Sequence, residues 1–356
     1  MFRKNIKEMQ GYTPGEQPKE KSLIKLNTNE NPYPPSQKVE KCLKSLNYDK
    51  LRLYPDPLSD ELRNTIAKKY RLKKENILIG NGSDEILTIA VRSFVGEKEE
   101  IGCFEPTYSL YPVLAKIQNA EIVKVPLDEK DNFEFPEKLA DINTELFQNV
   151  KNTKLFFITR PNAPTGTAFE IEKIEKFCKI FNGVVFIDEA YADFADDNCL
   201  GLLKKYPNVI IGRTLSKSYS LAGIRLGWAI ANKEIIEGML KVKDSYNVNY
   251  ITQKLAITAL QDQKYFEKII SKIKASRKRL IDALRELKFK VIPSQSNFVL
   301  ASPPKGNAEK LFKFLRKNNI LVRFFPSNIT DKYIRITIGT DEEIDTLIRF
   351  CEIFLS

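Results

Sequence analysis

The stretch that decides the fold runs from residue 211 to 228 and reads IGRTLSKSYSLAGIRLGW. Its lysine, Lys217, follows a short β-branched run, and Arg225 comes eight positions later. The hydroxylated neighbours are Thr214, Ser216 and Ser218. A lysine at a strand end beside hydroxyls and a second cation suits Schiff-base chemistry, because such neighbours favour the neutral amine. The hydroxyls and Arg225 can also hold a phosphate. A loop lysine with an ion-paired arginine remains the alternative for this segment alone.

Composition indicates a soluble α/β enzyme. The chain has 356 residues, of which 42% are apolar and 29% charged, enough for one large domain and a smaller one. No apolar run approaches the ~18 residues that span a bilayer, and the first residues lack the apolar core of a signal peptide. We therefore expect a cytoplasmic protein with no membrane partner. The five scattered cysteines predict reduced thiols, with neither disulfides nor a metal site.

Histidine is absent from the sequence. This excludes a Ser-His-Asp triad, a Cys-His pair and an H-E-x-x-H zinc site, so the proton carrier of an enzyme must be another side chain, with Lys217 the natural candidate. The net charge of +11 comes from lysines and arginines interrupted by apolar residues and glutamates. We expect no nucleic-acid partner, but a basic protein attracts a phosphorylated, anionic substrate.

Short apolar runs alternate with amphipathic segments, which predicts a mostly parallel sheet with helices on both faces. The expected strands are 77–79, 101–104, 155–159, 184–187 and 209–212, and the expected helices lie near 58–71, 84–95, 108–118, 170–181 and 233–243. A long helical stretch, 252–288, then introduces strands near 289–301 and 333–338 and helices at 307–318 and 341–354. We expect an N-terminal extended arm (1–45), a large domain (46–245) and a small α+β domain (246–356).

Polar motifs follow three of the expected strands, at the sheet edge where open parallel sheets bind ligands. Gly80-Asn81-Gly82-Ser83-Asp84-Glu85 follows the first strand, where Ser83 or Asp84 can cap a helix whose free N–H groups favour an anion. A plain capped turn explains this motif equally well. The strand 155–159 is followed by a turn with two prolines, Pro161 and Pro164, which predicts a rigid loop with cis bonds.

The strand 184–187 is followed by Asp188, Glu189 and Tyr191. An aspartate at the end of a buried strand loses hydration unless it meets a cation or a donor, and a protonated pyridine nitrogen is such a partner. A helix-capping role is the alternative for Asp188. Together, consecutive strand ends supply a rigid turn, an aspartate with a tyrosine, and a lysine.

With these motifs in place, the chain resembles the fold-type I pyridoxal-phosphate aminotransferases, and within them it is most similar to the histidinol-phosphate aminotransferases. Segments that carry the resemblance occur in the family's order over nearly the whole chain. They are LNTNENPYPP (26–35), LYPDP (53–57), GNGSDEIL (80–87), EPTYSLY (105–111), PNAPTG (161–166), DEAYADF (188–194), TLSKSYSLAGIRLGW (214–228), YNVN (246–249), ILVRFF (320–325) and YIRITIGT (333–340).

The resemblance implies a role for each matching residue. Lys217 binds pyridoxal 5′-phosphate as a Schiff base and moves the proton, Asp188 pairs with the ring nitrogen, and Tyr191 contacts the ring 3′-oxygen. The other cofactor-binding residues it implies are Ser83, Asp84, Tyr108, Asn162, Thr214, Ser216 and Arg225, with Tyr54 reaching the phosphate in the neighbouring subunit of a homodimer. The substrate-binding residues it implies are Arg335 for a carboxylate and, for the distal phosphate, Arg323, Tyr12 and Asn29.

Simpler explanations stay open for some of these residues. Tyr108 and Tyr54 are also explained as packing aromatics, and Arg323 as a surface ion pair. The sequence departs from the family at Ala163, where many relatives carry the asparagine that contacts the 3′-oxygen. Tyr191 then carries this contact alone, or Asn162 reaches it from a shifted loop.

The implied reaction is transamination between L-histidinol phosphate or glutamate and the matching 2-oxo compound, a step of histidine biosynthesis. Aromatic-amino-acid aminotransferase and threonine-phosphate decarboxylase are alternatives of the same fold. A pyridoxal-phosphate-sensing regulator is a non-enzyme alternative, which the lack of room for a DNA-binding module before residue 45 disfavours.

Overall fold

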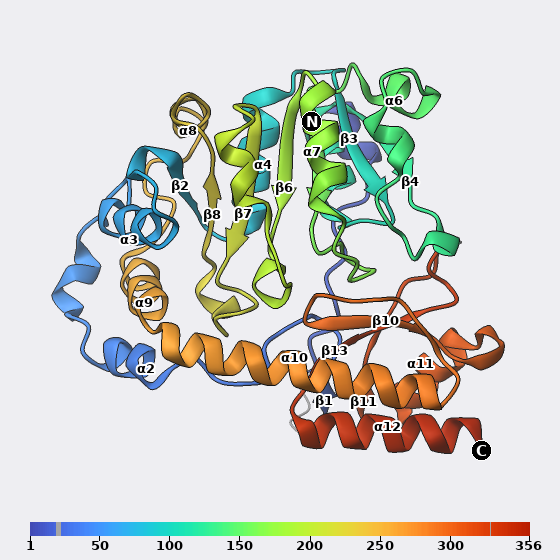
Figure 1. Cartoon of the computed structure of the whole chain (residues 1–356). Helices are drawn as coiled ribbons and strands as arrows, with labels where there is room; N and C mark the ends of the chain where they lie inside the picture. Colours follow the sequence, from blue (N-terminus) through green and yellow to red (C-terminus); the bar gives the residue numbers. More distant parts are fainter. Residues whose placement is uncertain (19–22, 328) are drawn as a thin grey trace.

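The computed structural model describes residues 1–18, 23–327 and 329–356. Its larger part is built on a seven-stranded sheet with the strand order β2-β8-β7-β6-β5-β3-β4 (Figure 1). Neighbouring strands are parallel except at β8, which runs antiparallel to both β2 and β7. The strands are β2 (Ile77–Gly80), β3 (Glu100–Glu105), β4 (Glu121–Pro126), β5 (Leu155–Thr159), β6 (Val184–Asp188), β7 (Val209–Thr214) and β8 (Gly227–Ile230).

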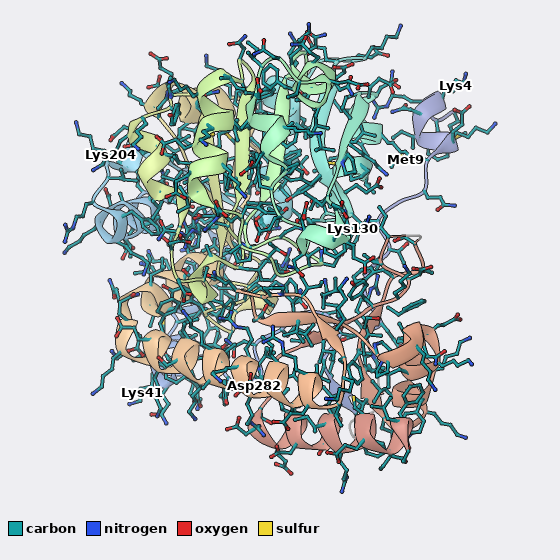
Figure 2. The ribbon with its side chains drawn as sticks, turned by 45° about the vertical axis from the view of Figure 1, so that its right-hand side comes forward. Lys4, Met9, Lys41, Lys130, Lys204 and Asp282 are labelled. Atoms are coloured by element: carbon teal, nitrogen blue, oxygen red, sulfur yellow. The ribbon has the colours of Figure 1, made fainter. Side chains whose placement is uncertain are left out.

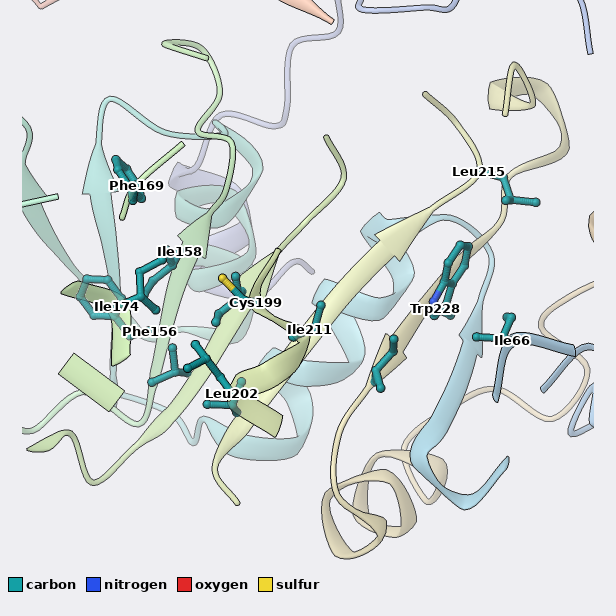
Figure 3. Packing of buried hydrophobic residues seen from close by; sticks show 14 of the residues in the cluster. Ile66, Phe156, Ile158, Phe169, Ile174, Cys199, Leu202, Ile211, Leu215 and Trp228 are labelled. Carbon is teal, nitrogen blue, oxygen red and sulfur yellow. The ribbon is translucent and has the colours of Figure 1, made fainter. Parts of the chain in front are cut away.

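Helices cover both faces of this sheet, and its central strands are therefore buried on both sides. Every residue of β5 and β7 is buried, so side chains of alternate residues enter two separate cores. One core packs against α4 (Ser83–Phe94), α5 (Leu110–Gln118) and α8 (Lys233–Leu240). The opposite core packs against α3 (Asp60–Tyr70), α7 (Ile171–Ile180) and α9 (Tyr250–Gln261). Figure 3 shows part of the second core, where Trp228 of β8 lies near Ile66 of α3.

A smaller part lies below the large sheet in Figure 1. Its four-stranded antiparallel sheet has the order β12-β13-β10-β9, and β1 pairs with β11 beside it. These strands are β1 (Ile24–Lys25), β9 (Lys290–Val291), β10 (Phe298–Ser302), β11 (Ile320–Leu321), β12 (Arg323–Phe324) and β13 (Ile334–Thr337). The helices are α10 (Gln263–Glu286), α11 (Ala308–Lys317) and α12 (Asp341–Leu355). The mostly parallel α/β architecture with a smaller C-terminal α+β part is thus confirmed, while the exact domain boundaries stay a prediction.

The N-terminal arm is less extended than the sequence predicts. Residues Gln37–Lys44 form helix α2, whose N-cap Ser36 accepts a hydrogen bond from the amide of Val39, and α2 packs against α9. The prolines before Ser36 suggested an extended segment. They show only where a helix cannot begin, and α2 begins just after them. A short helix, α1 (Lys4–Glu8), lies against α5, and the chain beyond Met9 runs toward the smaller sheet (Figure 2).

Two further expectations need correction. The helical stretch predicted for 252–288 is broken at Asp262, which ends α9 and begins α10. Strands β4 and β8 were not predicted: β4 is a half-exposed edge strand, and β8 directly follows the lysine segment. Within the described ranges, no helix has the length and apolar character needed to cross a membrane.

Candidate active site

A cavity of about 1150 Å³ lies between the carboxyl ends of the parallel strands and the smaller sheet. Thr159, Asp188 and Thr214, the last residues of β5, β6 and β7, line it from the large sheet. Arg323 and Arg335 line it from β12 and β13, and the N-terminal arm contributes a third wall. The predicted residues in the lining are Tyr12, Asn29, Ser83, Asp84, Tyr108, Asp188, Tyr191, Thr214, Ser216, Lys217, Arg225, Arg323 and Arg335.

Lys217 lies at the centre of this cavity, three residues beyond β7. Its amine donates a hydrogen bond to the backbone carbonyl of Thr28 (3.2 Å) and lies 5.8 Å from the centre of the Tyr191 ring. Burial, together with the positive charges of Arg335 and Arg225, lowers the pKa of this amine to about 8. Among the described residues, no carboxylate forms an ion pair with this amine. The amine is therefore able to react with an aldehyde.

Asp188 is buried at the end of β6. Its carboxylate accepts hydrogen bonds from the hydroxyl of Tyr111 (2.9 Å) and from the amide of Ala190 (3.1 Å). Tyr111 is itself fully buried and shares a 2.6 Å hydrogen bond with Thr159. Burial raises the pKa of Asp188 to about 6, against the effect of these donors. A cationic partner in the cavity would reverse this shift. The hydrogen bond from the Ala190 amide is of the kind that a helix-capping aspartate accepts. Asp188 also lines the cavity, which a capping role does not explain.

Tyr191 and Asn29 form one hydrogen-bonded unit. The Asn29 amide donates to the Tyr191 hydroxyl (2.9 Å), and its carbonyl oxygen accepts from Thr337 (3.1 Å). Asn29 has a left-handed backbone with φ of 57°, a conformation that asparagine tolerates better than most residues. Both side chains are buried, so the tyrosine hydroxyl is fixed where it faces the cavity.

The opposite wall offers an anion site at the N-terminus of α4. Contrary to expectation, neither Ser83 nor Asp84 caps this helix: Gly82 is the N-cap, and no side chain accepts from the first turn. Gly82 has φ of 87°, and a Cβ there would lie 2.6 Å from the guanidinium of Arg225. The first-turn N–H groups and Arg225 thus share one side of the cavity, which suits a phosphate.

The Asp84 carboxylate does not face this anion site as a ligand. It accepts a hydrogen bond from the Tyr108 hydroxyl (3.1 Å) and pairs with Arg225 (3.3 Å). A phosphate would therefore meet the backbone of Asp84, as the resemblance implies. Thr214 and Ser216 add two buried hydroxyls, 2.9 Å apart.

Tyr108 lines the cavity with its ring half-buried. The ring of Tyr12 meets it edge-on, with 5.9 Å between the ring centres. Tyr12 comes from the N-terminal arm and Tyr108 from the loop before α5, so the two aromatics connect segments far apart in the sequence. An aromatic ring in this lining suits contact with a flat ligand.

Arg323 and Arg335 are partners in register across β12 and β13. Arg335 donates to the carbonyl of Asn27 (3.0 Å), while its Nε is buried without a hydrogen bond. Arg323 makes only long contacts of 3.4 and 3.5 Å to backbone carbonyls in the arm. Among the described residues, neither guanidinium pairs with a carboxylate. The surface ion pair considered for Arg323 is therefore not observed in this part of the chain. Two unpaired guanidiniums on one cavity wall predict an anionic ligand.

Two predicted residues lie away from this cavity. Asn162 is fully buried, and its amide donates to the Pro106 carbonyl (3.2 Å) and to Thr165 (3.0 Å). Ala163 and Pro164 line the cavity in its place. The loop contains the expected cis bonds, Arg160–Pro161 and Ala163–Pro164. Asn162 therefore holds the loop and does not line the cavity, and its contact with the 3′-oxygen stays a prediction.

Tyr54 is the second predicted residue outside the cavity. Its side chain is 81% exposed and stacks on Tyr246, with 4.4 Å between the ring centres. Tyr54 does not line the cavity of its own chain, and its role in a neighbouring subunit stays a prediction.

The donor set fits pyridoxal phosphate on these observations. The uncapped first turn of α4 with Arg225 suits the phosphate, and the buried carboxylate of Asp188 suits a protonated ring nitrogen. The amine of Lys217 suits the aldehyde, and the orphaned Nε of Arg335 suits a substrate anion.

Sequence reasoning missed Tyr111, which holds Asp188. The segment EPTYSLY contains Tyr111, but an aromatic in a helix facing apolar residues is ordinarily core. Its spacing of three residues from Tyr108 brings the two rings together at the start of α5, with 5.7 Å between their centres, and this spacing was the available signal.

Comparison with known proteins agrees with this geometry. Residues 21–350 match the family described as aminotransferase class I and II. The histidinol-phosphate aminotransferase of Microcystis aeruginosa is 46% identical over 343 residues, which cover 96% of this chain and 95% of that protein. The crystal structure of the histidinol-phosphate aminotransferase from Clostridium acetobutylicum is 27% identical, with a TM-score of 0.85 over 94% of this chain and 99% of that one.

A third relative shares the fold with a bound ligand. The histidinol-phosphate aminotransferase of Sinorhizobium meliloti, in complex with pyridoxal 5′-phosphate, has a TM-score of 0.84 at 24% identity, covering 93% of this chain and 91% of that one. The family match spans nearly the whole chain and includes the cavity lining except Tyr12, Gly15 and Gln17 of the N-terminal arm. The chain belongs to the aminotransferases of class I and II, which are pyridoxal-phosphate-dependent enzymes.

Proposed function

We propose that the protein is a histidinol-phosphate aminotransferase, which exchanges an amino group between L-histidinol phosphate and 2-oxoglutarate in histidine biosynthesis. The observation that carries this assignment is the pair Arg323 and Arg335 on one cavity wall without a carboxylate partner in the described chain. Relatives at 40–46% identity over nearly full length bear the same name.

The two arginines explain how one pocket accepts both substrates. Histidinol phosphate carries a phosphate but no α-carboxylate, whereas glutamate carries two carboxylates. Arg335, the more enclosed of the two, binds the anionic group nearer the reacting carbon, and Arg323 binds the distal phosphate or carboxylate. Planar guanidiniums match both anions, which a lysine ammonium does less well.

When bound, pyridoxal phosphate supplies an electron sink for the carbon that bears the amine. Ser83 and Asp84 through their N–H groups, and Arg225, Thr214 and Ser216 through their side chains, would hold the phosphate. Asp188 would hold the ring nitrogen in its protonated form. Tyr191, supported by Asn29, would contact the ring oxygen, and Tyr108 would contact the ring.

Lys217 carries the proton in this proposal. With a pKa of about 8, roughly a tenth of the free amine is neutral at pH 7, enough to accept a proton from the substrate carbon at Nζ. With the cofactor bound, the same Nζ would also give the proton up again, so that Lys217 would serve as both base and acid. The carbonyl of Thr28 accepts from Nζ and orients the amine.

An assay of amino donors tests the assignment. The purified protein is expected to turn over histidinol phosphate with at least tenfold higher kcat/KM than phenylalanine, and to release no CO₂ from threonine phosphate. Better turnover of phenylalanine would instead identify an aromatic-amino-acid aminotransferase. Lys217→Ala provides the control, because it should abolish the borohydride-stable attachment of the cofactor and nearly all turnover.

The proposal includes a homodimer with shared active sites. Exposed apolar residues gather in α2, in the 3₁₀ helix η1 (Tyr48–Arg52) and after it: Leu43, Tyr48, Leu51, Leu53, Tyr54 and Leu58, with Tyr246 stacked on Tyr54. A second copy that covers them would bring Tyr54 to the partner's phosphate. Light scattering should give twice the chain mass, and Tyr54→Phe should weaken cofactor binding without dissociating the dimer. A monomer at micromolar concentration would contradict this part.

A cytoplasmic location completes the proposal. The five cysteines are unpaired, and four of them are buried, as suits a reducing compartment. Fractionation of the source cells should recover the activity with cytoplasmic markers.

A further inference from the structure

A network of buried charges lies beside the active site but does not line its cavity. It consists of Glu189, Asp193 and Arg213, with the hydroxyl of Ser218 at one end; we call it the Arg213 network. Arg213 pairs with Glu189 (2.5 Å) and with Asp193 (2.9 Å). Ser218 donates to the second oxygen of Asp193 (2.6 Å). None of these four residues is among those that line the cavity.

The network follows from the strand register. Asp188 and Gly212 are partners on β6 and β7, so the residues that follow them, Glu189 and Arg213, meet in the same way. Because side chains alternate along a strand, these two project to the sheet face opposite that of Asp188 and Thr214. Asp193 comes from the 3₁₀ helix η5 (Ala192–Phe194), just beyond Tyr191.

Each member is adjacent in sequence to a residue of the proposed chemistry. Glu189 follows Asp188, Ser218 follows Lys217, and Asp193 lies two residues after Tyr191. The network therefore connects the loop after β6 to the loop after β7 by charge-assisted contacts. It also reaches the 3₁₀ helix η6 (Cys199–Lys204), where the Cys199 amide donates to Glu189 (2.6 Å).

Stability alone is a poor reason for such a network. Arg213 is 5% exposed and the Glu189 side chain is fully buried, so both have lost their hydration. Buried ion pairs often contribute no more stability than apolar residues of the same volume. What a buried network does supply is a fixed relative position of the segments that carry it.

We propose that Arg213, Asp193 and Ser218 are positioning residues that hold the backbone of Lys217 in place against Asp188 and Tyr191. The Lys217 side chain must release the cofactor and return to it in every half-reaction, while its backbone stays still. Asp193 fixes Ser218 from one side, and Asn31 donates to the carbonyls of Lys217 (3.0 Å) and Ser218 (3.4 Å) from the other. The inference rests on the proposed role of Lys217.

Ser218→Ala and Asp193→Asn test the network with two small changes. Helices α10 and α12 of the smaller part offer a matched control: buried Ser276 donates to Asp341 (2.8 Å), which pairs with Arg279 (3.1 Å), all outside the cavity lining. Ser276→Ala and Asp341→Asn remove the same chemical groups there. We expect all four variants to melt within a few degrees of one another.

The decisive readouts are kcat, KM and the rate at which cofactor-free protein captures pyridoxal phosphate at Lys217. We expect Ser218→Ala and Asp193→Asn to lower kcat and the capture rate at least fivefold, with KM for glutamate changed less than twofold. The two control variants should leave all three unchanged. Equal behaviour of the two pairs would overturn the inference. If Ser218→Ala does not fold, Asp193→Asn decides alone. A wild-type protein without aminotransferase activity would instead overturn the proposed function.

Discussion

The hydroxyl of Tyr111, a fully buried residue in the first turn of α5, donates a hydrogen bond of 2.9 Å to the carboxylate of Asp188. The same hydroxyl lies 2.6 Å from Thr159 at the end of β5. Residues of α5, β5 and β6 thus meet at the hydroxyl of Tyr111. A buried carboxylate with a fixed donor keeps one orientation, which a cofactor ring needs in order to bind in one way.

Tyr111→Phe should weaken pyridoxal-phosphate binding. The substitution removes a hydrogen bond to a charged group, which is typically worth about 1.5–3 kcal/mol, so we expect a dissociation constant about 10- to 150-fold higher. Equilibrium titration of the cofactor-free protein measures it. Tyr206→Phe is the control, because Tyr206 also donates to a carboxylate, Glu175 (3.2 Å), but far from the cavity. Unchanged binding in Tyr111→Phe would show that Ala190 alone holds Asp188.

Asp188 should make the cofactor-free protein less stable as pH rises. Its pKa of about 6 lies above the ordinary 3.8, so between these values the folded state binds more protons than the unfolded state, and stability falls with rising pH. The loss amounts to at most about 3 kcal/mol and is complete above pH 6. Asp188→Asn removes it. Denaturant titrations measure the free energy of unfolding of both proteins. The variant should gain stability relative to the wild type between pH 4.5 and pH 7.5. An equal difference at both pH values would contradict the prediction.

Capture of pyridoxal phosphate by Lys217 should depend on pH. The attacking form is the neutral amine, so below the pKa of about 8 the rate should rise about tenfold per pH unit and then level off. Arg335→Gln removes a positive charge that lowers this pKa, and the midpoint should move roughly half a pH unit or more upward. Arg349→Gln is the control: it removes a positive charge from α12 and should leave the midpoint unchanged. If the midpoint does not move in Arg335→Gln, the charge of Arg335 does not contribute to the pKa of Lys217.

Arg323→Ala should separate the two substrates. A charge-assisted contact to phosphate is typically worth about 1.5–3 kcal/mol, so kcat/KM for histidinol phosphate should fall about 10- to 150-fold. Capture of the cofactor should stay as in the wild type, because Arg323 lies on the wall opposite Arg225. Donor assays with histidinol phosphate and phenylalanine measure the effect. An equal loss for both donors would place Arg323 outside the distal anion site.

The sequence predicted the parts of this site that lie where strands end. Asp188 directly follows an apolar run and Lys217 comes a few residues after one, and such runs have few structural interpretations. Tyr111 and the Glu189–Arg213 pair escaped because their roles depend on which strands are neighbours, and periodicity does not contain that information. Whether Asn162 lines the cavity was also beyond the sequence, since the direction of a side chain in a turn depends on the hydrogen bonds that its amide makes, here to Pro106 and Thr165.

The pairing of β1 with β11 has a consequence for synthesis of the chain. Ile24 pairs with Ile320, so β1 is synthesised long before its partner. The seven-stranded sheet, complete by Ile230, can assemble before that partner exists. Contacts of such long sequence separation form slowly, since a large loop must close first. Thr28 and Asn31, which contact Lys217, lie a few residues after β1, so a nascent chain has its reactive lysine before the strand pair beside these two neighbours can form.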